Sequence, residues 1–409
     1  MTSSLALRSR RGFTLVEVLV AVGISSFLIA AVFFVMTSSS RMFRVQADIS
    51  QVTDRMGFAM DEIKNDLRRA SFLTVPNAYL DQEDYPWYRT VCAAPPWLLI
   101  QDGVSPVAHS VWVREPAGGT LEYYEPSDDD MVLPGESPDQ LVILGSFRAE
   151  TPFRPTSMQS GADRLTIPNG LHSDADMQYM FDDAFVAVST PAGGMQFLAL
   201  DSVIPGPTET VLVFQQLLDA DPTGTGLETC NFTGFGGATY EVIPLHFVRY
   251  SIVVDPEDRE STVLIREELD HNMEALNATS RHIVARDIVD FQIWFDGIAA
   301  GAANTDITLD RETGTLVDTE GSIGTDTMAG SATSRPEGVR FGYVQLSARL
   351  DTAIAREHPN PTAPMREFVE LQSCSEDGTC QSGGEWARVV TTRAEVELPN
   401  MNLANTRTD

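Results

Sequence analysis

The chain has 409 residues, of which 43% are hydrophobic, and this is enough for about two domains with real hydrophobic cores. It carries 28 Lys and Arg against 58 Asp and Glu, for a formal net charge of -30. Such a charge repels phosphate backbones, and the sequence has no basic stripe that would bind them. Composition therefore excludes wholesale disorder and argues against a nucleic-acid partner.

The amino-terminal region predicts a membrane-spanning helix. Three basic residues, Arg8, Arg10 and Arg11, precede residues 13–36, which contain one charge, Glu17, in an otherwise apolar or small-polar run. A helix of that length spans about 36 Å, enough for a bilayer core of about 30 Å. Because basic residues stay on the cytoplasmic side, we expect residues after 36 to be exported.

Two other kinds of amino-terminal segment, a cleaved secretory signal and a plain membrane anchor, also contain an apolar run. A cleaved secretory signal has a shorter apolar core followed by a small-residue cleavage site, and here Ser38, Ser39 and Ser40 follow without an A-x-A pattern. A plain anchor fits the hydropathy, but a lone carboxylate in hydrocarbon costs several kcal/mol unless it finds a partner. The position of Glu17 at the start of the apolar run therefore indicates a role for its charge.

Residues 11–20, Arg-Gly-Phe-Thr-Leu-Val-Glu-Val-Leu-Val, resemble the class III signal of type IV prepilins and type II secretion pseudopilins. The resemblance implies that a prepilin peptidase removes residues 1–12 as a basic leader by cutting after Gly12. It also implies methylation of the new amino terminus at Phe13. Glu17 would then pair with the terminal ammonium group of a neighbouring subunit, which offsets the desolvation of both charges.

The helical pattern continues beyond the membrane segment as one apolar stripe. Pro76 predicts its end, so we expect one helix over about residues 14–74, with residues 37–75 as its exported half. Acidic residues such as Asp66 are expected mostly on the other faces. The stripe is expected to pack under a sheet, and its residues recur every three or four positions: Val45, Ile49, Val52, Met56, Ala59, Ile63, Leu67 and Ala70.

Residues 76–409 have a strand-like pattern, with short runs of β-branched and aromatic residues between Pro, Gly and Asp clusters. Alternation at 289–295 and 344–350 predicts antiparallel strands with one buried face. Further strands are expected at 141–144, 184–190, 195–203, 210–214, 240–254, 261–268 and 386–398.

Two loop-rich stretches interrupt this region. Residues 219–237 are interpreted as a boundary between two sub-domains, and residues 299–337 predict a long, mobile surface loop. The fold class expected is α+β of the type IV pilin kind: a long amino-terminal helix, half of it transmembrane, packed on antiparallel sheets.

Three later segments resemble PilW-type minor pilins and the related J-type minor pseudopilins. They are residues 284–293, residues 338–341 and residues 388–392. The length of the chain and the stretch at 299–337 depart from those families, so the choice between pilus and secretion system stays open.

The four cysteines would lie in an oxidising compartment if the chain is exported. Cys374 and Cys380 flank a five-residue polar turn, which favours a local disulfide. Cys92 and Cys230 would then remain to pair, although sequence does not determine connectivity. A zinc site is the alternative, but neither Cys92 nor Cys230 belongs to a close pair.

Motifs for catalysis and cofactors are missing from the sequence. There is no H-E-x-x-H, G-x-S-x-G or G-x-x-x-x-G-K-[ST] motif. Two aspartate groups, Asp128 to Asp130 and Asp174, Asp176, Asp182 and Asp183, carry oxygen atoms that could ligate calcium, but they do not have EF-hand spacing. We expect a protein that is not an enzyme and has no metal or other cofactor.

These observations predict a minor pilin, a structural subunit of the tip or priming complex that starts pilus assembly and so supports motility. The alternatives are a minor pseudopilin of a type II secretion system and a pilus-tip adhesin. The expected partners are the prepilin peptidase, the inner-membrane assembly platform, other minor pilins and the major pilin. The expected location is the inner membrane, single-pass with the later region in the periplasm, and then the pilus tip or cell surface.

Overall fold

A computed structural model describes sixteen ranges of the chain. The ranges are 14–70, 100–101, 106–107, 111–114, 138–158, 163–189, 195–215, 240–255, 261–269, 280–297, 308–309, 316–318, 321–322, 339–355, 368–374 and 380–398. The chain divides into two compact units, Met1–Gln51 and Val52–Asp409.

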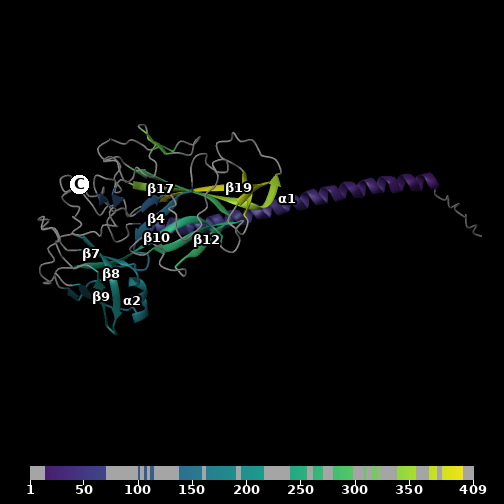
Figure 1. Cartoon of the computed structure of the whole chain (residues 1–409). Coiled ribbons are helices and arrows are strands. Elements are labelled where there is room, and N and C mark those ends of the chain that lie inside the picture. The colour runs from purple at the N-terminus through teal and green to yellow at the C-terminus, as the bar shows by residue number, and fades with distance from the viewer. Residues whose placement is uncertain are drawn as a thin grey trace, which may run out of the picture. The chain divides into compact units, whose positions relative to one another are not determined.

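The long helix α1 runs over Leu15–Arg69, 55 residues, and is the purple ribbon of Figure 1. Its later part is amphipathic as predicted: the stripe residues from Val52 to Ala70 are buried, and Ala59, Ile63 and Leu67 have no exposed surface. Val45 and Ile49 are half-buried. The expected α+β class, with a long helix packed on antiparallel sheets, is confirmed.

The helix ends earlier than Pro76 predicts. Ala70 forms an antiparallel bridge with Gly145 at the end of β4 (Gln140–Gly145), and Arg69 donates to the carbonyl of Phe147 at 2.9 Å. The helix therefore ends where Ala70 makes this contact with the sheet. Pro76 itself lies outside the described residues.

Asp66 corrects the expectation that acidic residues lie on the outer faces of the helix. It is buried, and its Oδ2 accepts from the Tyr250 hydroxyl at 2.6 Å and from Arg266 Nε at 2.7 Å. One turn earlier, Glu62 Oε1 lies 2.6 Å from His282 Nε2, and this hydrogen bond lowers the pKa of Glu62. Polar contacts therefore hold α1 on the sheet in addition to the apolar stripe.

The larger sheet has ten strands, all paired antiparallel, in the order β12-β11-β10-β7-β8-β9-β6-β5, with β4 joining β10 to β3. The predicted strands are confirmed as β4, β7, β8, β9, β10 and β11. Their bounds and those of their sheet partners are β3 Val111–Arg114, β5 Ser157–Met158, β6 Arg164–Pro168, β7 Phe185–Ser189, β8 Met195–Pro205, β9 Glu209–Phe214, β10 Glu241–Val254, β11 Thr262–Leu269 and β12 His282–Arg286.

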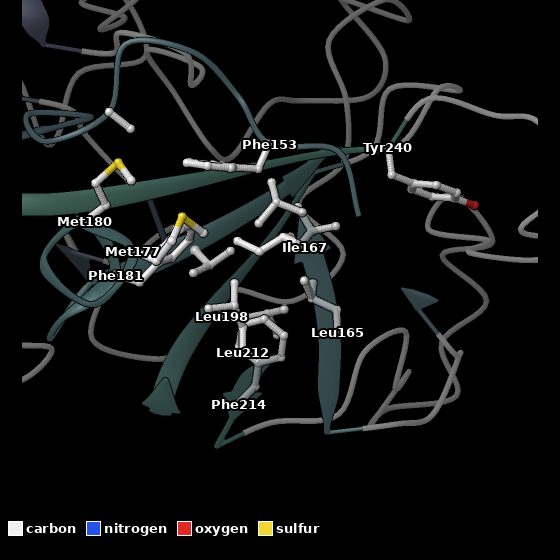
Figure 2. Packing of buried hydrophobic residues seen from close by; sticks show 14 residues of the cluster. Phe153, Leu165, Ile167, Met177, Met180, Phe181, Leu198, Leu212, Phe214 and Tyr240 are labelled. Carbon is white, nitrogen blue, oxygen red and sulfur yellow. The ribbon is translucent and has the colours of Figure 1, made fainter. Parts of the chain in front are cut away.

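A short helix, α2 (Asp174–Phe181), packs on β8 and was not predicted. Ser173 caps it, since Asp176 N donates to Ser173 Oγ and Ser173 N donates to Asp176 Oδ2. Met177 and Phe181 of this helix point into the same interior as Leu198 and Leu212 of the strands (Figure 2). These side chains form a separate apolar core under β6–β9.

The second sheet has four strands, in the order β13-β17-β19-β18, with bounds β13 Ile288–Gly297, β17 Val339–Ala355, β18 Phe368–Cys374 and β19 Cys380–Glu397. The strands predicted at 289–295, 344–350 and 386–398 are confirmed here. Their polar face, however, is not solvated: Asp290, Gln292, Gln345 and Ser347 are at most 3% exposed. They bury because the acid, amides and hydroxyl bond to one another across β13 and β17.

Five short strands complete the described structure. β1 (Ile100–Gln101) pairs with β2 (Pro106–Val107). Within the predicted mobile stretch at 299–337, β14 (Thr308–Leu309), β15 (Leu316–Asp318) and β16 (Gly321–Ser322) form a small antiparallel sheet. The rest of that stretch, and the expected boundary at 219–237, lie outside the described residues.

Candidate functional site at the start of α1

The described chain begins with a reciprocal capping box around the one charge of the apolar segment. Thr14 donates from its backbone nitrogen and its hydroxyl to Glu17 Oε2, at 3.0 and 3.1 Å. Glu17 N in turn donates to Thr14 Oγ1 at 3.3 Å. The carboxylate therefore satisfies a backbone donor that the first turn of a helix leaves without an intrahelical partner.

The side chains that follow Glu17 are exposed and apolar. Leu15, Leu19, Phe27 and Phe34 are between 68% and 83% exposed. α1 is the one helix in the described part of the chain that is long and apolar enough to cross a membrane, and this stretch of it is not covered by the protein. An uncovered apolar surface of this size belongs in hydrocarbon or against another protein.

The side chains of two polar residues in this stretch bond to their own helix. Ser26 Oγ donates to the carbonyl of Val22 at 2.8 Å, and Thr37 Oγ1 donates to the carbonyl of Phe33 at 3.0 Å. Such bonds to the preceding turn satisfy the hydroxyl groups without water. The segment is therefore compatible with a lipid environment, with Glu17 as its one ionisable group.

A comparison with family models identifies this region. Residues 7–33 match the prokaryotic N-terminal methylation motif. The chain is type IV pilin-like at its amino terminus. A search of curated proteins gives no match, and a search of solved structures gives none either.

The match has consequences for processing and location. A class III signal implies cleavage by a prepilin peptidase and assembly with other pilins, and pilins are structural proteins. The apolar part of α1 fits a single-pass membrane anchor. The predicted cleavage residues Gly12 and Phe13, and the basic residues Arg8, Arg10 and Arg11, lie outside the described residues.

The predicted cysteine pairs are placed only in part. Cys374 at the end of β18 and Cys380 at the start of β19 are register partners in the antiparallel pair. Opposed residues in such a pair have Cα atoms about 4.5–5.5 Å apart, within the range that a disulfide needs. Cys92 and Cys230 lie outside the described residues.

The aspartates around α2 have structural partners. Asp176 belongs to the capping box, and Asp174 Oδ1 accepts from Asn169 at 3.3 Å. Asp182 Oδ1 accepts from Gln178 at 3.4 Å. Across the described ranges, no group of three or more His, Cys, Asp or Glu side chains is placed to hold a metal ion. Asp128 to Asp130 lie outside those ranges.

Proposed function

We propose that the chain is a minor pilin of a type IV pilus machine, a structural subunit of the tip or priming complex that starts pilus assembly. The observation that carries the proposal is the methylation motif at residues 7–33, which overlaps the start of α1. The end of that same helix is buried in a β-rich region. A subunit built in this way is held in the membrane before assembly and presents a folded region outside it.

In this proposal the peptidase cuts after Gly12 and Phe13 becomes the methylated amino terminus. Residues 13–36 span the inner membrane, with the leader in the cytoplasm and residues from 37 onward in the periplasm. After assembly the subunit lies at the pilus tip or cell surface.

Glu17 is proposed to bind the terminal ammonium group of a neighbouring subunit. Both hydrogen bonds that it accepts within the described residues end on Oε2. A carboxylate has two oxygens and about four acceptor sites, so the capping box and an intermolecular ion pair are compatible. The same side chain would be satisfied before assembly by Thr14 and during assembly by the neighbour as well.

Support for a PilW-type subunit comes from the strands on which the resembling segments lie. Residues 284–293 cover the end of β12 and the start of β13, residues 338–341 include the start of β17, and residues 388–392 lie on β19. β13, β17 and β19 are neighbours in one sheet. The proposed partners are other minor pilins, the major pilin and the inner-membrane assembly platform.

The proposed cleavage after Gly12 and methylation of Phe13 can be tested directly. Intact-mass analysis of the protein from membranes is expected to give a chain that starts at methylated Phe13, and Gly12→Trp is expected to keep the leader. A mature amino terminus beyond Met36 would identify an ordinary cleaved signal and overturn the proposal.

Assembly tests the role of Glu17, with two variants that separate charge from capping. Glu17→Val removes both, whereas Glu17→Gln keeps a capping oxygen and removes the charge. If the ion pair operates, the neighbour's ammonium loses its partner in both variants, at a cost of about 3–5 kcal/mol. Both are then expected to insert normally and to crosslink less to other pilin subunits. Normal crosslinking in Glu17→Gln would show that the charge has no role in assembly.

A deletion strain distinguishes the class of machine. Loss of pili with intact protein secretion is the result expected for a minor pilin. Loss of secretion with normal pili would assign a pseudopilin, and loss of adhesion by normal pili would assign a tip adhesin.

A further inference from the structure

The carboxyl-terminal end of α2 is held by one arginine from outside the helix. Arg148, in the segment after β4, donates from Nη1 to the carbonyl oxygens of Tyr179 and Asp182 at 2.6 and 3.2 Å. Its guanidinium group also lies 4.6 Å from the centre of the Tyr179 ring. The last carbonyls of a helix carry a partial negative charge and favour a cation at this position.

The other end of the same guanidinium group is connected to α1 through a series of ion pairs. Arg148 Nη2 pairs with Glu268 on β11, and the side chains are 10% and 13% exposed. The second oxygen of Glu268 lies 3.9 Å from Nη1 of Arg266, whose Nε lies 2.7 Å from Asp66 Oδ2 on α1. Asp66, Arg266, Glu268 and Arg148 therefore form a row of alternating charges, which we call the ion ladder.

The surroundings of the ion ladder make each charge depend on its neighbours. All four side chains are between 10% and 13% exposed, so water compensates little for the loss of one charge. His246 on β10 is buried, and its burial, together with the charges of Arg148 and Arg266, lowers its pKa well below the ordinary value. A neutral His246 adds no further positive charge to the row.

We infer that the ion ladder couples the seating of α1 on the sheet to the packing of α2, so that loosening one end loosens the other. The coupling runs from α1 through two residues of β11 to the segment after β4 and then to the end of α2. This inference concerns the folded region and does not depend on the proposed function. It gives the second half of α1 a physical connection to a helix that lies far from it in the sequence.

Hydrogen exchange of the full chain in detergent micelles tests the coupling. Asp66→Asn removes the charge at the α1 end, and Arg148→Met removes it at the α2 end. We expect Asp66→Asn to speed amide exchange in α2 about tenfold, the change that corresponds to about 1.4 kcal/mol. Arg148→Met is expected to speed exchange in residues 52–69 in the same way. In the double variant, exchange in α2 is expected to be no faster than in Arg148→Met, and exchange in residues 52–69 no faster than in Asp66→Asn.

Matched controls separate the ladder from general destabilisation. Ile63→Val removes a buried methylene from α1 without touching the ladder. Arg164→Met removes an arginine that pairs with Asp163 at the start of β6, in the sheet on which α2 packs. Ile63→Val is expected to leave amide exchange in α2 unchanged, and Arg164→Met is expected to leave amide exchange in residues 52–69 unchanged. Faster exchange in α2 for Ile63→Val as for Asp66→Asn, or an Asp66→Asn effect confined to α1, would overturn the inference. If Asp66→Asn does not fold, Glu268→Gln removes the charge in the middle of the ladder instead. Amide exchange is then expected to be faster both in α2 and in residues 52–69.

Discussion

Gly145 lies directly against the last residue of α1. A Cβ atom at Gly145 would be 2.4 Å from the carbonyl oxygen of Arg69, which is closer than real Cβ atoms approach backbone. Ala70 pairs with the same glycine in an antiparallel bridge. The end of the helix therefore reaches the sheet only because this position has no side chain.

We expect Gly145→Ala to destabilise the fold by about 1–3 kcal/mol, because backbone must shift to make room. Gly57→Ala is the control, since a Cβ at Gly57 has nothing within 4 Å and alanine favours a helix by about 1 kcal/mol over glycine. Denaturant unfolding of the full chain in micelles is expected to show opposite signs for the two variants. Equal stability of Gly145→Ala and wild type would show that the helix end can move away at little cost.

The capping box of Thr14 and Glu17 predicts a local effect on α1. Thr14→Ala removes the hydroxyl that accepts from Glu17 N, whereas Thr14→Ser keeps it. Loss of a cap of this kind costs about 0.5–2 kcal/mol. Amide exchange in residues 15–18, measured in micelles, is expected to rise in Thr14→Ala and to stay near wild type in Thr14→Ser. A rise in both variants would assign the effect to the threonine methyl group.

The register of Cys374 and Cys380 predicts a disulfide in the β18–β19 hairpin. Alkylation of the folded protein without reductant is expected to leave both cysteines unlabelled, and labelling is expected after reduction. The stabilisation in the chain-entropy model is about 2 kcal/mol for so short a loop, so reduction should loosen the hairpin without unfolding the chain. Labelling of both cysteines before reduction would contradict the pairing.

Periodicity was sufficient to predict the packed face of α1. The residues from Val52 to Ala70 recur every three or four positions, and a helix places such residues on one side. Asp66 could not be predicted as buried in the same way, because its partners Tyr250 and Arg266 lie 184 and 200 positions away. A carboxylate next to an apolar stripe is usually solvated, and only tertiary structure brings an arginine and a tyrosine to it.

The candidate site was predictable because it is a local motif. Residues 11–20 carry the glycine, the aromatic residue and Glu17 in the spacing of the class III signal, so no tertiary contact is needed to find them. α2 was missed although Ser173 and Asp176 have the spacing of a capping box. With eight residues and two aspartates it has too little apolar periodicity to distinguish it from a loop.

The polar face of the second sheet shows where alternation misleads. Period-two alternation gives the positions of the two faces but not what covers them, and Asp290 was expected to face solvent. Asp290 instead accepts from Gln292 and Gln345 at 3.0 and 3.2 Å and is 2% exposed. Burial raises the pKa of Asp290 to about 6, from an ordinary value of 3.8.

This raised pKa predicts how stability depends on pH. Because the folded state holds the proton more tightly than the unfolded state, Asp290 costs nothing at pH below about 3.8, and the cost grows until about pH 6 and then stays constant. The difference of about two pKa units corresponds to roughly 3 kcal/mol above pH 6. Asp290→Asn removes the charge, so it is expected to stabilise the fold at pH 8 relative to wild type and to lose that advantage by pH 4.

Denaturant unfolding of both proteins between pH 4 and pH 8 measures this difference directly. Asp163→Asn serves as the control, because Arg164 lowers the pKa of Asp163 by a hydrogen bond at the surface, and any pH effect there has the opposite sign. The oxygen of the new asparagine can still accept from Gln345 and Ser347, but its amide nitrogen then faces Gln292, whose amide must turn over to accept; this reduces the gain at pH 8 without changing its pH dependence. A constant difference between Asp290→Asn and wild type across the whole range would show that Asp290 is protonated throughout or paired with a cation when it ionises.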